Sequence, residues 1–176
     1  MFGDLHIHMI LDGVYYRAAI DAQKEHPLDG LVRARLSDYQ ARGVCLLRDG
    51  GDAWGVSLRA RELAGEYGID YRSPAFPIYR RGHYGAFIGR GFDTEDEYRA
   101  LLDEAGEKRA DFIKLMISGL IDFDHFGVLT EPGPEPQDIR RMIELAHAAG
   151  FAVMAHANGD RAVTAALQAG VDSIEH

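Results

Sequence analysis

The sequence predicts an α/β fold, a partial TIM (β/α) barrel with about six parallel strands and outer helices. Short apolar runs alternate with amphipathic segments along the chain, which is the pattern of a parallel sheet. The apolar runs are nearly continuous, as expected for strands that are covered on both faces. The 176 residues suit one domain, whereas a complete barrel typically needs ~250. We therefore expect residues 1–176 to form a single, incomplete barrel domain.

The six expected strands are apolar segments, and each is followed by polar residues or glycine. An open parallel sheet of this kind leaves an apolar edge, which is unfavourable in a monomer. The sequence therefore leaves three alternatives, namely a fragment of a longer protein, a homo-oligomer, or a chain whose barrel a second chain completes. The strands are Phe2–Met9, Val44–Arg48, Ile69–Phe76, Phe112–Ile117, Ala152–Ala157 and Ser173–His176.

The segments between these strands predict amphipathic helices. Tyr15–Lys24 is expected to be one further helix after the first strand. Thr94 and Glu97 have the spacing of a capping box. Pro136 stands near the start of another helix, where its missing N–H costs nothing. Glycines at which these helices are expected to end are Gly43, Gly68, Gly106, Gly150 and Gly170.

Composition excludes several classes of function. The chain has 47% hydrophobic and 27% charged residues, as soluble globular domains do. Its net charge of −9, without a basic block, argues against a nucleic-acid partner. Cys45 is the single cysteine and fits a reducing compartment. Because no apolar run is long enough to span a membrane and no signal peptide is evident, we expect a cytoplasmic protein without a membrane partner.

Four of the eight histidines stand at the ends of expected strands. His6 and His8 are two residues apart on the first strand, so both rings point to one face and can reach one ion. His156 and His176 end two later strands. Because the carboxyl ends of barrel strands meet at one mouth, the four imidazoles predict a metal site. The alternative is a barrel fragment with structural, hydrogen-bonded histidines.

Lys114 lies inside an apolar strand, in Phe-Ile-Lys-Leu-Met. A buried ammonium is costly, so this side chain is expected to reach the barrel mouth or to be chemically altered. A neutral lysine can add carbon dioxide and become a carbamate, an anionic ligand able to bridge two metals. The alternative is an ordinary lysine whose head group reaches solvent or pairs with a carboxylate.

Two long connections, Pro77–Phe92 and Gly119–Glu135, follow strand ends, where parallel folds build their sites. We expect both to be functional loops, the alternative being plain surface excursions. Polar side chains crowd the first of them and are candidates for binding a substrate carboxylate. A polar loop without this role is the alternative reading. The candidates are Arg80, Arg81, His83 and Tyr84.

These residues resemble the amidohydrolase superfamily, in its imidazolonepropionase-like and prolidase-like branch. The likeness rests on His-x-His in strand one, Phe-Ile-Lys-Leu-Met-Ile-Ser-Gly, Met-Ala-His-Ala-Asn-Gly and Ala-Gly-Val-Asp-Ser-Ile-Glu-His. It implies two divalent metal ions, with zinc as the expected element. It further implies that His6 and His8 hold one ion, that His156 and His176 hold the other, and that a carboxylated Lys114 bridges them.

The resemblance implies a hydrolase that attacks amide-type bonds, of peptides or cyclic amides, through a metal-bridged hydroxide. The family aspartate that accepts the proton belongs to strand eight, and Asp49, Asp122 and Asp124 do not match its position. We therefore expect activity to need residues beyond 176, and no catalytic residue is assigned within this chain. The alternatives are a lactonase, deaminase or decarboxylase of the same superfamily, or a non-catalytic metal-binding fragment.

Overall fold

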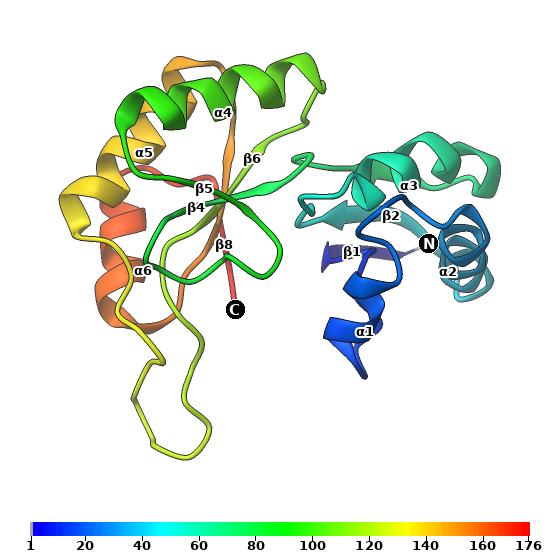
Figure 1. Cartoon of the computed structure of the whole chain (residues 1–176), viewed down its shortest axis with the longest axis horizontal. Coiled ribbons are helices and arrows are strands. Elements are labelled where there is room, and N and C mark those ends of the chain that lie inside the picture. Colours follow the sequence, from blue (N-terminus) through cyan, green and yellow to red (C-terminus); the bar gives the residue numbers. More distant parts are fainter. Residues whose placement is uncertain (1) are drawn as a thin grey trace. The chain divides into compact units, whose positions relative to one another are not determined.

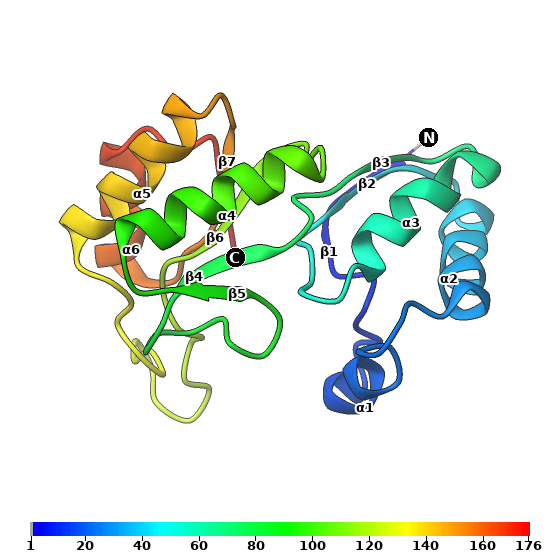
Figure 2. The same ribbon diagram turned by 45° about the horizontal axis from the view of Figure 1, so that its top comes forward.

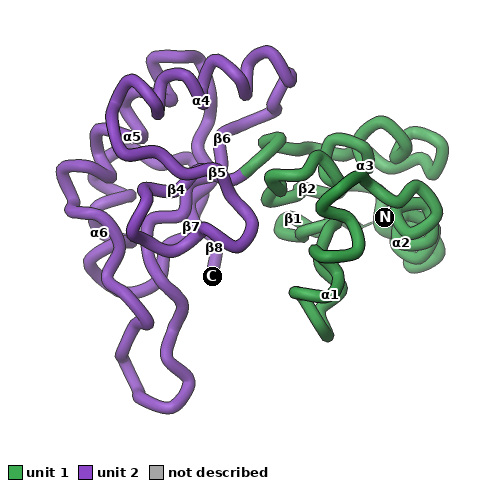
Figure 3. Tube along the Cα trace, viewed as in Figure 1, with its two compact units in different colours: residues 1–76 green, residues 77–176 purple. Residues whose placement is uncertain are grey.

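A computed structural model describes residues 2–176. The chain forms two compact units, residues 1–76 and residues 77–176 (Figure 3). Each unit contains its own parallel sheet, and all pairings between the named strands are parallel. The predicted α/β class is confirmed, while the grouping of the whole chain as a single domain stays a prediction.

The first unit carries a three-stranded sheet in the order β1-β2-β3 (Figure 1). Apolar side chains such as Leu47 and Leu36 are fully buried between the sheet and its helices. The first three expected strands are therefore present, although the third is shorter than its apolar run. The elements are β1 (Phe2–Ile7), α1 (Tyr16–Asp21), α2 (Asp29–Ala41), β2 (Val44–Asp49), α3 (Val56–Ala64), a 3₁₀ turn (Gly65–Tyr67) and β3 (Asp70–Arg72).

The second unit carries a five-stranded sheet in the order β5-β4-β6-β7-β8. Helices α4, α5 and α6 lie along one face of that sheet (Figure 2). Every residue of β6 and β7 is buried, which explains their continuous apolar sequences. The elements are β4 (Pro77–Arg80), β5 (Arg90–Phe92), α4 (Glu95–Glu107), β6 (Ile113–Met116), α5 (Pro136–Ala148), β7 (Val153–His156), α6 (Gly159–Gln168) and β8 (Ser173–Glu175).

The expectation that Pro77–Phe92 is a loop throughout was wrong. Its first residues form β4, which pairs with β6, and its last residues form β5. Ile78 and Phe92 are buried on these strands. Both strands are too short for an alternating or continuous apolar pattern, and Pro77 stands at the first position of β4, where a strand tolerates proline.

Helix ends follow the local signals closely. The Thr94 side chain accepts a hydrogen bond from Glu97 N at 3.2 Å and caps α4. The Glu97 carboxylate in turn accepts from the backbone N–H of Asp93 at 2.7 Å, one residue before the cap. Pro136 is in the first turn of α5, as predicted.

Gly106 does not end a helix, contrary to expectation. Helix α4 continues through Gly106 to Glu107, and Arg109 takes the left-handed conformation with φ of 54°. A Cβ at position 106 would lie 3.8 Å from Phe151, an ordinary van der Waals distance, so crowding does not explain this glycine. Gly43, Gly68, Gly150 and Gly170 do take positive φ beyond the helices they follow. None of the helices within residues 2–176 has the length and apolar character needed to cross a bilayer.

Candidate active site

The first unit holds the His-x-His pair at the end of β1. The ring centroids of His6 and His8 lie 5.5 Å apart, so both imidazoles occupy one side of the strand end, as predicted. The contacts around His8 explain how its ring is held.

The ring of His8 is oriented by the turn that follows β2. Its Nδ1 lies 3.0 Å from the carbonyl oxygen of Gly51. A carbonyl can only accept, so Nδ1 carries a proton, and in the neutral ring Nε2 then carries the lone pair. Metal-binding histidines typically show this arrangement, in which one ring nitrogen donates to the protein and the other is a ligand.

Gly50 makes room for this ring. A Cβ at position 50 would lie 2.4 Å from Cε1 and 2.6 Å from Nε2 of His8, well inside van der Waals contact. Gly51 has φ of +82°, and a Cβ there would lie 2.9 Å from the Cα of Phe76. A side chain at position 50 would therefore collide with the His8 ring, and one at position 51 would collide with the backbone of Phe76.

Asp49, which the sequence placed at a strand end without a role, anchors this turn. Its Oδ2 accepts from Met9 N at 2.9 Å, and its Oδ1 accepts from Gly51 N at 2.5 Å. The Tyr71 hydroxyl also donates to the carboxylate. Asp49 is fully buried and joins the end of β1, the Gly-Gly turn and β3. A carboxylate at a strand end followed directly by two glycines is the sequence signal that points to this role.

A second buried acid, Asp52, caps α3. Its Oδ1 accepts from the N–H groups of Trp54 at 2.9 Å and Val56 at 3.1 Å, and its Oδ2 accepts from Ser57 N at 2.7 Å. Burial, and then the charge of Asp49, raise the pKa of Asp52 to about 6. In the folded state Asp52 therefore keeps its proton up to about pH 6, whereas in the unfolded chain it loses the proton near pH 3.8.

Asp52→Asn should remove a pH dependence of the free energy of unfolding. Because the folded pKa lies above the unfolded one, this carboxyl makes the wild type less stable as pH rises from about 4 to about 6. A shift of about two pKa units corresponds to ~3 kcal/mol. Urea unfolding from pH 4 to 8 should show the variant gaining roughly that much over the wild type. Exposed Asp96→Asn is the control, and a constant difference across this range would contradict the prediction.

The second unit brings together the remaining predicted ligands. His156 ends β7 and His176 follows β8, and their ring centroids lie 4.7 Å apart. Lys114 on β6 is fully buried. In the β6–β7 register Lys114 pairs with Met154 and Met116 with His156, so Lys114 and His156 share one face of the sheet.

The electrostatics of this cluster favour neutral imidazole at His176. Partial burial of the ring, followed by the nearby charge of Lys114, lowers the pKa of His176, while Glu175 opposes the shift. Metals bind histidine in its neutral form. Glu175 pairs with His156 in the β7–β8 register and is 8% exposed, so it shares the face of His156. Sequence analysis missed Glu175, although a carboxylate inside an apolar strand is itself a signal.

Loop residues surround the His156 ring. Its Nε2 lies 3.3 Å from the Gly119 carbonyl oxygen and 3.3 Å from Asn158 Nδ2. Asn158 also donates from Nδ2 to Gly119 O at 3.1 Å and from its backbone N–H to Ser118 Oγ at 2.7 Å. The Tyr84 ring lies 5.1 Å from the His156 ring. Both long connections of this unit therefore contact His156.

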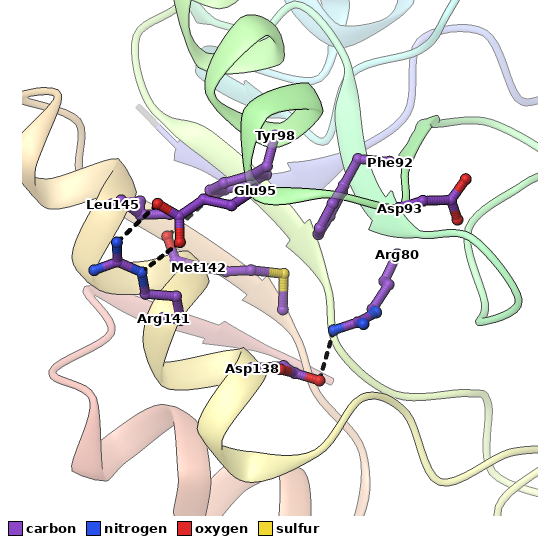
Figure 4. Close-up of a pocket in the computed structure, with 9 residues that line it drawn as sticks. All are labelled: Arg80, Phe92, Asp93, Glu95, Tyr98, Asp138, Arg141, Met142 and Leu145. Atoms are coloured by element: carbon purple, nitrogen blue, oxygen red, sulfur yellow. Dashed lines mark hydrogen bonds and ion pairs between the residues drawn. The ribbon is translucent and has the colours of Figure 1, made fainter.

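The four candidate substrate-binding residues separate into two pairs. Arg80 binds Asp138 at 2.6 Å, beside a pocket of about 190 Å³ (Figure 4). Arg81 binds Asp93 at 2.7 Å and Glu97 at 2.8 Å. Carboxylates thus occupy both guanidinium groups, and the Glu131 carboxylate likewise accepts from His83 Nδ1 and from the backbone N–H of Tyr84. The apolar part of the pocket is formed by Phe92, Tyr98, Met142 and Leu145.

The candidate ligand groups, which are imidazoles, are of the type that binds divalent transition metals. One unit supplies the imidazoles of His6 and His8, and the other supplies two adjacent imidazoles and a buried lysine. Within residues 2–176, no group of three or more His, Cys, Asp or Glu side chains is arranged to hold an ion. The structure thus shows a histidine pair in each unit, and the complete ligand set stays a prediction.

Comparison with known proteins identifies the fold. No protein-family model matches the chain, and no curated protein sequence does either. Among solved structures, an uncharacterized protein is similar with a TM-score of 0.76 at 25% identity. A Xaa-Pro dipeptidase with bound methionine gives a TM-score of 0.70 at 20% identity, and A. niger ochratoxinase gives 0.72 at 19%.

Each of these matches covers 99% of this chain but only 46% or 47% of the other chain. A structure of an amidohydrolase matches over the same extent, with a TM-score of 0.63. The parallel sheets described above therefore correspond to a part of a larger barrel in all of them. The chain therefore has the same fold as these structures, over a little under half of their length.

Proposed function

We propose that the protein containing this chain is a metal-dependent hydrolase of amide-type bonds, in peptides or cyclic amides. The observation that carries the proposal is the His8 ring, held through Nδ1 by Gly51 O so that Nε2 has its lone pair beside His6. The similar structures include a Xaa-Pro dipeptidase and an ochratoxinase, which supports hydrolysis as the reaction class.

In this proposal each histidine pair holds one divalent ion, with zinc as the expected element. His6 and His8 hold the first ion, His156 and His176 hold the second, and a carboxylated Lys114 joins them. When bound, divalent ions lower the pKa of a water molecule and polarise a substrate carbonyl. The chain's own contribution is to fix the orientation of the imidazoles, as the contact of His8 Nδ1 with Gly51 O illustrates.

Substrate contacts are proposed for the loop after β4. His83 and Tyr84 are the stronger candidates, since the Tyr84 ring lies 5.1 Å from His156. Arg80, Arg81 and His83 would have to exchange their present carboxylate partners for a substrate carboxylate. The group that accepts the proton is proposed to lie outside residues 1–176, and the single Cys45 supports a cytoplasmic location.

The proposal predicts that His6→Ala/His8→Ala loses bound metal. Elemental analysis after zinc loading and dialysis should find less zinc in this double variant than in the wild type. The control is His26→Ala/His147→Ala, which removes two histidines outside the proposed ligand set and should keep the wild-type content. Equal zinc in all three proteins would contradict the metal assignment.

A substrate panel tests the reaction. Xaa-Pro dipeptides, N-acyl amino acids, cyclic amides and lactones are offered to the zinc-loaded full-length protein that contains this chain, and to its His6→Ala/His8→Ala variant. Turnover of an amide that disappears with the metal supports the proposal. A preference for lactones would point to the lactonase alternative, and bound zinc without any turnover would favour a metal-binding fragment.

A further inference from the structure

One carboxylate, Glu131, joins the two long connections of the second unit. Its Oε1 accepts from Tyr84 N at 3.0 Å, and its Oε2 accepts from His83 Nδ1 at 3.0 Å and from Gly133 N at 2.8 Å. Partial burial opposes ionisation of Glu131, but His83 and the two backbone donors hold its pKa below the usual value. The side chain is therefore an anion that accepts three hydrogen bonds at neutral pH.

The backbone around Glu131 is fixed independently of these contacts. Gly119 N donates to Glu131 O at 3.1 Å, and a Cβ on Gly119 would lie 2.7 Å from Glu131 N. Gly133 has φ of +79°, and a Cβ there would lie 2.1 Å from Ile117 O. This close backbone packing holds Glu131 next to the end of β6. The carboxylate is thus a fixed point to which the loop of residues 81–89 is attached.

His156 is contacted by both of the segments that Glu131 joins. Gly119 O lies 3.3 Å from His156 Nε2, on the side of the connection that contains Glu131. The Tyr84 ring lies 5.1 Å from the imidazole, with an interplanar angle of 32°, and comes from the loop that the carboxylate holds. Tyr84 follows His83 directly, so the two hydrogen bonds to Glu131 set where the Tyr84 ring can lie.

We propose that Glu131 is a positioning residue that holds the Tyr84 ring against His156 and thereby restricts the orientation of the imidazole. The inference rests on the proposed function in one respect, namely that His156 is a site residue. A glutamine at this position has one acceptor oxygen, and its amide group would meet N–H donors. Glu131→Gln is therefore expected to release residues 83–84 while keeping the size of the side chain.

The test uses NMR spectroscopy of the metal-free chain. In the wild type, a nuclear Overhauser effect should connect the ring protons of Tyr84 and His156. In Glu131→Gln this effect should disappear, and the amide protons of Tyr84 and Gly133 should exchange with solvent roughly tenfold faster or more. The matched control is Glu104→Gln, which breaks the Arg90–Glu104 ion pair of the same unit at a similarly exposed glutamate. The control should keep the Tyr84–His156 nuclear Overhauser effect and the slow exchange of the Tyr84 and Gly133 amide protons.

Retention of the Tyr84–His156 effect in a folded Glu131→Gln protein would overturn the inference. Folding is judged from slow amide exchange in β6 and β7, which should persist in both variants. If Glu131→Gln does not fold, Glu131→Asp is measured instead, because its shorter carboxylate cannot accept from all three donors. Loss of the Tyr84–His156 nuclear Overhauser effect in this variant supports the inference, and retention of the effect overturns it. Neither measurement involves metal binding or turnover. The inference about Glu131 can therefore fail or succeed independently of the proposed hydrolase function.

Discussion

Gly50→Ala should weaken zinc binding at the His6–His8 pair by roughly 10–100-fold. The added methyl group would lie 2.4 Å from Cε1 of His8, so the ring has to move. Moving the ring breaks its hydrogen bond to Gly51 O, which sets the tautomer that presents Nε2. The same crowding is expected to lower the free energy of unfolding by about 1–3 kcal/mol.

Gly30→Ala is the matched control for this substitution. Gly30 lies in α2, and a Cβ there meets nothing within 4 Å. Alanine in a helix is favoured over glycine by ~1 kcal/mol, so this variant should be slightly more stable and bind zinc as the wild type does. Titration against a chromophoric chelator measures both affinities. Wild-type affinity in a folded Gly50→Ala protein would contradict the role assigned to His8.

Removing Lys114 should cost the protein one of its two proposed metal ions. Lys114 is fully buried on β6 and lies on the same face of the sheet as His156, one member of the histidine pair of the second unit. A carbamate there would supply an anionic oxygen, and metal binding would favour its formation because ligands bind in their basic forms. With both ions present, we expect a carbamate carbon-13 signal after labelled bicarbonate, and no such signal without metal.

Lys114→Ala should lose this carbon-13 signal and bind about half as much zinc as the wild type. Short carboxylic acids should restore part of the lost zinc binding. Lys114→Met fills the same buried space without a carbamate, and thus separates loss of a ligand from loss of packing. It should bind as little zinc as Lys114→Ala and should not respond to carboxylic acids. Two bound ions beside an unmodified Lys114 in the wild type would contradict the bridging role.

Local patterns of the sequence were sufficient for much of the fold. The six apolar runs predicted six strands, and β1, β2, β3, β6, β7 and β8 lie within or next to them. Thr94 and Pro136 marked the starts of α4 and α5. These features depend on neighbours a few residues apart, so periodicity and capping residues report them directly. The same is true of His6 and His8, because alternation along one strand places both rings on one face.

Contacts between distant segments were decided only by the tertiary structure. Strands β4 and β5 exist because β6 offers β4 a parallel partner, not because of their own four- and three-residue sequences. Asp49 acquires its role from Met9, 40 residues away, and Glu131 from His83, 48 residues away. Such hydrogen bonds leave no periodic trace in the chain. In the sequence, such a carboxylate cannot be told from an ordinary polar residue, because its N–H donors come together only on folding. Once the carboxylate is buried, losing any of these hydrogen bonds is costly.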